Sequence, residues 1–290
     1  MSTAAIVSVS TLDASKVSFG DIRMNKAGGK TVPIKYNGQS LQIRIPKSTY
    51  PMGINIRETD NGSTYQMALT LKGCDVFAKA KAGPEAGDLG SLYNFLLDMQ
   101  EKLLDVATAN SAKWFGRSRE RAVLQDLMKQ FISPSVEKIN GEWVATGKYP
   151  PSFRMKVPVY DGQVSMDVAD STGKPVVVDL ENISQIFPKR VEASVVVTPS
   201  VYVSGQGFGV TWRVTHARVA PPQRLTAAQV FADEIEEETS APAVSAAAAF
   251  EEEIAPAEAP APAPAPEPAP APAVAAKPAA NRRRAVAAAV

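Results

Sequence analysis

The segment VTWRVTHARV, residues 210–219, has the clearest strand pattern of the chain. Apolar and polar residues alternate in it from Val210 to Val214, which is the period of a strand with one buried face. This phase predicts that Trp212 and His216 share the core face and that Arg213 lies on the opposite one. His216 is the only histidine of the chain, and nothing near it in the sequence supplies an orienting carboxylate or a nucleophile, so a structural role is favoured over catalysis.

Further strands with the same alternation are expected upstream of this stretch. Gly205–Gly209 predicts a turn with a bulge between the last two strands, and Asn37-Gly38 suits a tight hairpin turn. The expected strands are Val17–Arg23, Lys30–Tyr36, Leu41–Pro46, Thr64–Leu71, Ser152–Tyr160, Gln163–Val168, Pro175–Asp179, Ala193–Val203 and Phe208–Val219.

A helical period interrupts the strands in the middle of the chain. From Leu89 to Val106 the apolar residues recur at three- and four-residue spacings, which predicts an amphipathic helix. A second helix is expected over Ser118–Phe131, closed by Pro134. Strands, a helix pair and strands again predict a mainly β fold, a small barrel with an inserted helix pair.

The composition argues against a disulfide, a cysteine-rich zinc site and a membrane span. Cys74 is the only cysteine, which excludes an intrachain disulfide and a cysteine-rich zinc site and favours a reducing compartment. No apolar run of about 18 residues is present, and Met1–Ser10 lacks the features of a secretory signal, so an intracellular protein without a membrane span is expected.

Two further motifs are weighed and set aside. Gly28-Gly29-Lys30-Thr31 ends like a phosphate-binding P-loop, but Met24 stands where the first glycine of that loop belongs, so a hairpin turn is favoured. The carboxylates are scattered and do not form a two-metal cluster. No enzyme, cofactor or metal is therefore expected.

The charges divide the chain into two opposed parts. Residues 1–225 carry 27 Lys and Arg against 20 Asp and Glu, whereas Thr226–Glu267 carries ten acids and no base. A basic body followed by an acidic arm fits a protein that holds a polyanion reversibly, because the arm can compete for the same surface. Single-stranded nucleic acid is the first ligand to consider.

Basic residues recur on the faces that the alternation assigns to solvent. Arg44 lies opposite the apolar set of Leu41–Pro46, Arg154 and Lys156 lie opposite that of Ser152–Tyr160, and Arg213 follows the same rule. They form either a groove that follows phosphates or an ordinary solvated strand face, and both interpretations fit the pattern.

Two aromatic residues are predicted to stack on bases, since stacking tolerates any sequence. Trp114 lies in the densest basic cluster, and the alternative is that it belongs to the start of a helix that docks on the barrel. Tyr50 lies in a predicted loop, and Trp212 is expected in the core. The full predicted nucleic-acid-binding set is Lys35, Arg44, Lys47, Tyr50, Arg57, Lys113, Trp114, Arg117, Arg154, Lys156 and Arg213.

Four segments in order along the chain carry a resemblance to a known family. They are Phe19–Ile22, Gly28–Gly38, the Ile-Pro and Pro-Met-Gly elements within residues 45–53, and Gly207–Val219. Together they resemble the OB-fold single-stranded-DNA-binding proteins of nucleocytoplasmic large DNA viruses. That group is similar to the acidic-tailed replication proteins of bacteriophages, which share the fold.

The resemblance implies a non-catalytic protein that coats single-stranded DNA in viral DNA replication, recombination or repair. It implies an OB-fold-like nucleic-acid-binding domain over residues 16–225 with the helical insert at about 88–132. A flexible N-terminus at residues 1–15 and a disordered tail at 226–290 would flank this domain. The host nucleus or a cytoplasmic viral replication site would be the location.

The resemblance also implies that the tail recruits replication proteins such as a polymerase or a primase-helicase. In the phage proteins the acidic arm ends in an aromatic residue, whereas here two phenylalanines each precede an acidic cluster and an Ala-Pro spacer follows. The predicted partner-binding residues are Phe231, Asp233, Glu234, Glu236, Glu237, Glu238, Phe250, Glu251, Glu252 and Glu253.

A second class of function fits the same composition. A structural or scaffold protein of a virion or assembly would pack the β-rich body against copies of itself and span between neighbours with the Ala-Pro arm. Salt-sensitive DNA binding separates the two hypotheses. The sequence leaves the choice between DNA and RNA open, and also the oligomeric state, for which a homodimer is one option.

Overall fold

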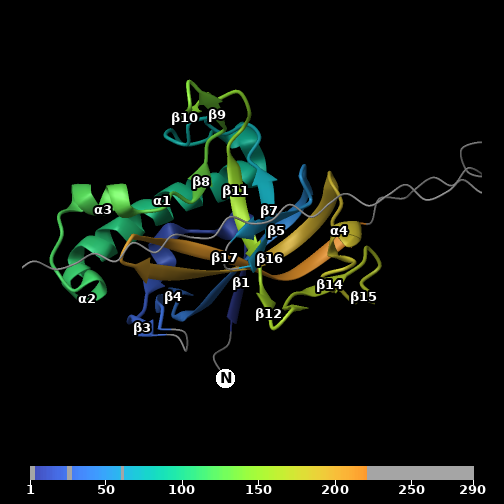
Figure 1. The fold of residues 1–290 in the computed structure, drawn as a ribbon, viewed down its shortest axis with the longest axis horizontal. Coiled ribbons are helices and arrows are strands. Elements are labelled where there is room, and N and C mark those ends of the chain that lie inside the picture. The colour runs from blue at the N-terminus through green and yellow to red at the C-terminus, as the bar shows by residue number, and fades with distance from the viewer. Residues whose placement is uncertain (1–3, 25–27, 60–61, 221–290) are drawn as a thin grey trace, which may run out of the picture. The chain divides into compact units, whose positions relative to one another are not determined.

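The computed structural model describes residues 4–24, 28–59 and 62–220, which belong to one compact unit (Figure 1). The helices are α1 (Gly87–Ala109), α2 (Ser111–Phe115), α3 (Arg121–Leu127) and α4 (Ile183–Ile186), with 3-10 turns η1 (Val9–Thr11), η2 (Ala14–Lys16) and η3 (Pro84–Ala86). None of these helices is long and apolar enough to cross a membrane.

Most of the described residues outside the helices form strands. They are β1 (Ala4–Ser8), β2 (Val17–Phe19), β3 (Arg23–Met24), β4 (Lys30–Tyr36), β5 (Gln39–Tyr50), β6 (Ile54–Thr59), β7 (Gly62–Thr70), β8 (Ile132–Ser133), β9 (Val136–Ile139), β10 (Glu142–Ala145), β11 (Ser152–Val157), β12 (Val159–Tyr160), β13 (Gln163–Val164), β14 (Asp167–Ala169), β15 (Pro175–Val176), β16 (Val191–Ser204) and β17 (Gly207–Ala220). The predicted mainly β fold with a helical insert is confirmed.

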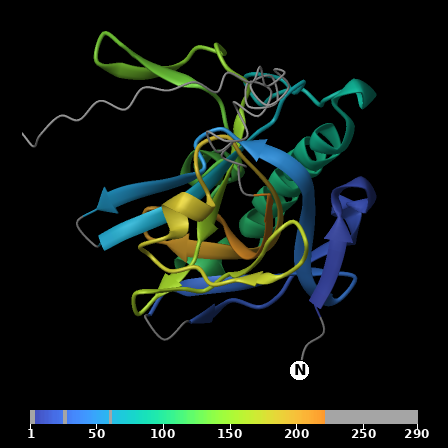
Figure 2. The same cartoon turned by 90° about the vertical axis from the view of Figure 1, so that its right-hand side faces the viewer.

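Five of these strands make a curled circuit. β5 pairs with β16, β16 with β17, β17 with β11, and β11 with β7, while β7 comes back against β5 without a hydrogen-bonded ladder. A five-stranded circuit closed on itself in this way is a partly open barrel of the OB type. Figure 2 views it from the side of β14 and β15, with α1 along one flank.

The core lies inside this circuit because the alternation points every second side chain inward. Ile43, Val197 and Val214 are fully buried in register with one another across β5, β16 and β17. Trp212 fills the core as predicted, with its ring 5.1 Å from that of Phe153. The apolar face of α1 joins the same cluster through residues such as Leu96 and Leu103.

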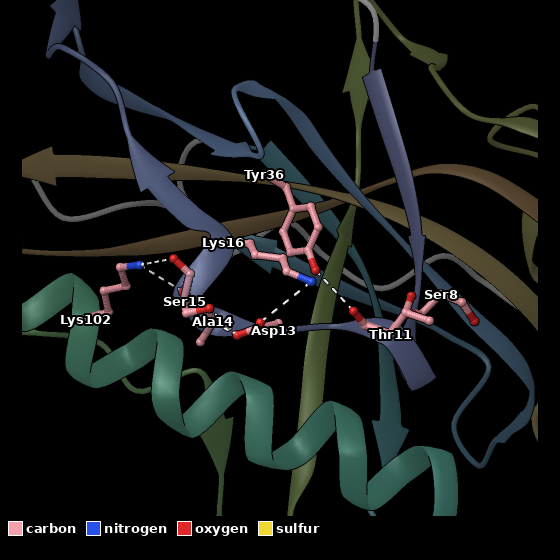
Figure 3. Close-up of polar contacts among 8 residues, drawn as sticks. All are labelled: Ser8, Thr11, Asp13, Ala14, Ser15, Lys16, Tyr36 and Lys102. Atoms are coloured by element: carbon pink, nitrogen blue, oxygen red, sulfur yellow. Dashed lines mark hydrogen bonds and ion pairs between the residues drawn. The ribbon is translucent and has the colours of Figure 1, made fainter.

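The N-terminal segment ties α1 to the barrel, which corrects the expectation of a flexible N-terminus for residues 4–15. β1 pairs in parallel with β5, and the turns that follow run between α1 and β4 (Figure 3). The Lys102 ammonium of α1 donates to the carbonyls of Ala14 and Ser15 at 2.9 and 3.0 Å. The Tyr36 hydroxyl of β4 donates to the Thr11 carbonyl at 3.1 Å.

The helical insert is shorter and more broken than its periodicity predicts. The expected second helix over Ser118–Phe131 is only α3 in the structure, and the separate short helix α2 ends before it at Gly116, a residue in the left-handed conformation. The loop expected around Tyr50 is instead the end of β5, followed by β6, which pairs with β7. In both regions tertiary packing overrides a weak local pattern.

Candidate nucleic-acid interface

The outer face of the curled sheet gathers the basic residues that the alternation predicts there. Lys156 of β11 is in direct register with Arg213 of β17, and Arg154 lies two residues away on the same face. Arg213 is in turn in register with Thr198 of β16. Residues in register share one face of a sheet, so these three cations form a continuous basic row.

Arg44 extends this row on the far side of β16. It is in register with Val196, which is in register with His216 of β17. At the other edge of the sheet, Asn55 of β6 is in register with Gln66 of β7, which is in register with Lys156. Arg57 lies two residues along β6 from Asn55 and therefore on the same face. The basic row therefore crosses strands β6, β7, β11, β17, β16 and β5.

A β-bulge corrects the predicted orientation of His216. Val197 pairs with Val214 but Val196 pairs with His216, so Thr215 is an extra residue and its hydroxyl donates to the Val196 carbonyl at 3.2 Å. The bulge reverses the alternation, and His216 and Arg218 face outward and are exposed. Sequence phase alone missed Arg218 because the bulge has no marker such as glycine.

The pairing of β14 with β17 places a carboxylate beside His216 that the sequence did not reveal. β14 runs parallel to the end of β17 and sets Asp167 opposite His216, with Oδ2 of the carboxylate 3.6 Å from Nε2 of the imidazole. Both side chains are exposed to solvent. Among the described residues no three His, Cys, Asp or Glu side chains gather in a way that could hold a metal ion.

A groove of about 960 Å³ is hollowed into the outer face at this end. Its floor is the outer side of β5, β16 and β17, and valines of residues 176–178 form one wall. Arg44, Lys47 and Arg218 line it together with His216. The groove thus combines apolar walls with cationic groups, the mixture that bases and phosphates require.

Positive charge dominates this face. Lys47 pairs with Glu192 at 2.6 Å, and the Arg218 guanidinium donates to the Ser171 carbonyl at 2.7 Å. Arg44, Arg154, Lys156 and Arg213, by contrast, pair with no acid of the described residues. Such unneutralised cations are available to an anionic ligand.

Tyr202 is an aromatic residue on this face that the predicted set lacks. It stands on β16 directly opposite Gly209, and the absence of a side chain there leaves room for the ring, whose hydroxyl lies 3.1 Å from where a Cβ of residue 209 would be. The ring is half-buried, and burial raises the pKa of its hydroxyl. The buried valines at 201 and 203 are the sequence signal that assigns Tyr202 to the outer face.

Two predicted stacking residues are in the core, so their assignment to the interface is wrong. Tyr50 is 0% exposed, its hydroxyl has no hydrogen-bond partner among the described residues, and burial raises the pKa of that hydroxyl. Trp114 is 3% exposed and packs edge-on against Phe208, with the ring centroids 6.4 Å apart. The docking explanation for Trp114 is the correct one.

The remaining predicted cations are dispersed. Lys113 donates to Asp21 at 2.8 Å, and this hydrogen bond, then the charges of Lys113, Arg23 and Lys35, lower the pKa of the Asp21 carboxyl. Lys35 and Lys113 are thus partly neutralised by one acid. Arg117 is exposed beside α2, away from the basic row. The predicted tail residues, Phe231 to Glu253, lie outside the described residues.

Comparisons with known proteins give only distant likenesses. No family profile matches the sequence, and no curated protein matches it. Among solved structures, a single-stranded-DNA-binding protein of bacteriophage T7, gp2.5, is 14% identical with a TM-score of 0.36, covering 70% of this chain and 98% of that one.

The single-stranded-DNA-binding protein of bacteriophage Enc34, solved in complex with single-stranded DNA, is 8% identical with a TM-score of 0.31, covering 71% of this chain and 94% of that one. A C-terminal truncation of the same protein is 11% identical with a TM-score of 0.32, covering 73% and 96%. These scores are too low for the likeness to argue for a function.

Proposed function

We propose that this chain is a non-catalytic single-stranded-DNA-binding protein that holds the strand across the outer face of its barrel. The observation that carries the proposal is the basic row, in which Lys156, Arg213 and Arg44 lie on one face without a described acidic partner. This arrangement suits a backbone that presents one negative charge per nucleotide.

The groove and Tyr202 would supply the contacts to bases. The half-buried ring of Tyr202, opposite Gly209, would stack on a base, and stacking contributes about 1 to 3 kcal/mol per base whatever the sequence. The valine wall of the groove would cover further bases. None of these contacts reads a base edge, so we expect little sequence preference.

The acidic segment from Asp233 to Glu253 would compete with DNA for the basic row and, once displaced, recruit replication proteins. This part of the proposal rests on the opposite charges of body and tail. It gives the protein a role in coating DNA during viral replication, recombination or repair, at whichever intracellular site that replication occupies.

The test is fluorescence anisotropy of a labelled 30-nucleotide oligo-dT and of a matching duplex at several salt concentrations. The double variant Lys156→Ala/Arg213→Ala should bind the single strand less tightly. The slope of log K against log salt should also fall by about 0.7 for each phosphate contact removed. The charge-matched control Lys72→Ala/Lys79→Ala changes exposed lysines on the loop after β7 and should bind like the parent.

Tight, salt-dependent binding to the single strand that is weakened only by the first double variant supports the proposal. Equal binding to duplex and single strand, or equal losses in both double variants, contradicts it. An absence of binding at low salt favours the structural or scaffold protein instead.

A further inference from the structure

A second basic cavity, of about 350 Å³, lies at the other end of the long β16–β17 ribbon. It is formed by the start of β4, the turn after β16, and the segment from α2 to Arg119. In Figure 1 α2 lies at the opposite end of the ribbon from β14 and β15, which border the groove. Ser204 is eight residues along β16 from Val196, so roughly 26 Å of strand separates the two.

This cavity is also on the other side of the sheet. Val32 and Ile34 of β4 are buried, and Lys30 shares their phase, so its side chain is directed inward and not onto the outer face. The Lys30 ammonium donates to the Trp114 carbonyl at 3.1 Å. An ammonium has three donors, so two remain for a ligand.

Arg119 provides the second cation of the cavity. Its guanidinium carbon lies 5.2 Å from the centre of the Phe115 ring, and its Nε is buried without a hydrogen-bond partner in the described part of the chain. No acidic side chain is among the residues that line the cavity. A buried donor without an acceptor is unfavourable, and a bound anion would remove that cost.

We propose that this cavity binds a nucleoside monophosphate unit, with the phosphate at Lys30 and Arg119 and the base stacked on the open face of the Arg119 guanidinium. The phosphate accounts for two cations that have no counter-charge among the residues that the structure describes. The planar guanidinium, fixed by Phe115, provides the stacking surface that an inorganic ion would not need. The volume is at the lower end of the range for small-molecule sites, which fits one nucleotide.

The unit could be a free nucleotide or the terminal nucleotide of a DNA strand, because both present the same phosphate and base. The proposal goes beyond strand binding on the outer face and uses none of its residues. It also gives a role to Lys30 of the Gly-Gly-Lys-Thr stretch, which lacks the glycine pattern of a P-loop. Lys30 would bind the phosphate together with Arg119, which lies in the segment between α2 and α3.

Isothermal titration calorimetry on the full chain tests the site with three probes: thymidine 5′-monophosphate, thymidine and inorganic phosphate. The nucleotide should bind at least tenfold more tightly than either fragment. Lys30→Met should weaken nucleotide binding by roughly tenfold or more, as expected for a lost charged hydrogen bond. Arg119→Lys keeps the charge but not the plane, so it should lose most of the preference for nucleotide over inorganic phosphate.

Lys79→Met is the matched control, since it makes the same substitution at an exposed lysine on the loop after β7, outside both proposed sites, and should leave nucleotide binding unchanged. Anisotropy with a short oligo-dT that carries either a 5′-phosphate or a 5′-hydroxyl distinguishes a free nucleotide from the end of a DNA strand. A preference for the phosphorylated strand that Lys30→Met abolishes identifies a strand end. Nucleotide binding without this preference identifies a free nucleotide.

No heat of binding with millimolar nucleotide, or equal losses in Lys30→Met and Lys79→Met, overturns the proposal. A thermal melt of each variant shows whether it is folded. If Lys30→Met is unstable, Arg119→Lys still tests the site, because a lysine at this position can also pack on Phe115. Failure here leaves oligo-dT binding by the outer face intact, and failure of the outer face leaves this site intact, so the two proposals are separable.

Discussion

Thr215 shows how one residue changes which groups a strand presents. Because it is left unpaired in the ladder, Trp212 and Val214 point into the core while His216 and Arg218 point out. A strict alternation would put His216 and Arg218 on the core face with Trp212, so Arg218 would not be assigned to the outer face. The side chains that line the groove on β17 therefore depend on a backbone irregularity and not on the hydrophobic pattern.

Tyr202→Leu tests the proposed stacking at the same scale. Removing the ring should weaken oligo-dT binding by about 1 to 3 kcal/mol, since the leucine keeps some cover over Gly209 but has no face for a base. Tyr160→Leu, an exposed tyrosine of the β12–β13 hairpin, is the control in anisotropy at fixed salt. Equal affinity of both variants would remove Tyr202 from the interface.

Cys74 should be slow to react in the folded protein. It is buried, and burial raises the pKa of its thiol from 9.0 to about 11, so at pH 8 the thiolate fraction is about a hundredfold lower than for an ordinary thiol. Labelling with a chromogenic disulfide at pH 8 should be correspondingly slower in buffer than in denaturing urea. Similar rates in both conditions would show that the loop around Cys74 opens readily.

At the scale of elements, hairpin turns are the most predictable parts of this chain. Asn37-Gly38 joins β4 and β5 as expected, with both residues at positive φ. Asn140-Gly141 has the same geometry and joins β9 and β10, a hairpin that the same dipeptide could have revealed. β6 carries no such local signal, since Pro51 and Gly53 suggest a loop and only its pairing with β7 makes it a strand.

Lys102→Met tests whether the N-terminal segment stabilises the barrel. The ammonium donates to two carbonyls of the segment that contains η2, and losing these charge-assisted hydrogen bonds should lower the free energy of unfolding by about 1 to 3 kcal/mol. Urea denaturation measures the change, with Lys79→Met as the control on an exposed lysine. An unchanged midpoint would mean that β1 and its neighbours are held by the β5 ladder alone.

At the scale of the whole molecule, the opposed charges of body and tail make a testable pair. Residues 1–225 have an excess of seven positive charges, 27 minus 20, and the ten acids of Thr226–Glu267 oppose it. Deleting residues 226–290 should tighten oligo-dT binding at low salt, with a smaller gain at high salt, because screening weakens the competition. Affinity that is unchanged or weaker at low salt would show that the tail does not compete.

The faces of β5, β11 and the first half of β17, and the succession of strands, helices and strands, could be predicted from the sequence alone. Alternation at 41–46, 152–157 and 210–214 reports burial directly, and that is why Arg44, Arg154, Lys156 and Arg213 are found on the outer face as predicted. The burial of Trp212 follows from the same period. These are local properties, since a residue's face is set by its neighbours two positions away.

Which of these faces lie side by side, and which aromatic residues are accessible, depends on tertiary contacts that the sequence pattern does not show. Lys156 and Arg213 are 57 positions apart in the chain, and only the parallel pairing of β11 with β17 puts them in register. Trp114 and Tyr50 are aromatic residues close in sequence to basic ones, as a stacking site requires. Trp114 is nevertheless buried against Phe208, and Tyr50 is buried in the barrel. Long-range pairing and burial depend on contacts between distant segments, which a local pattern does not encode.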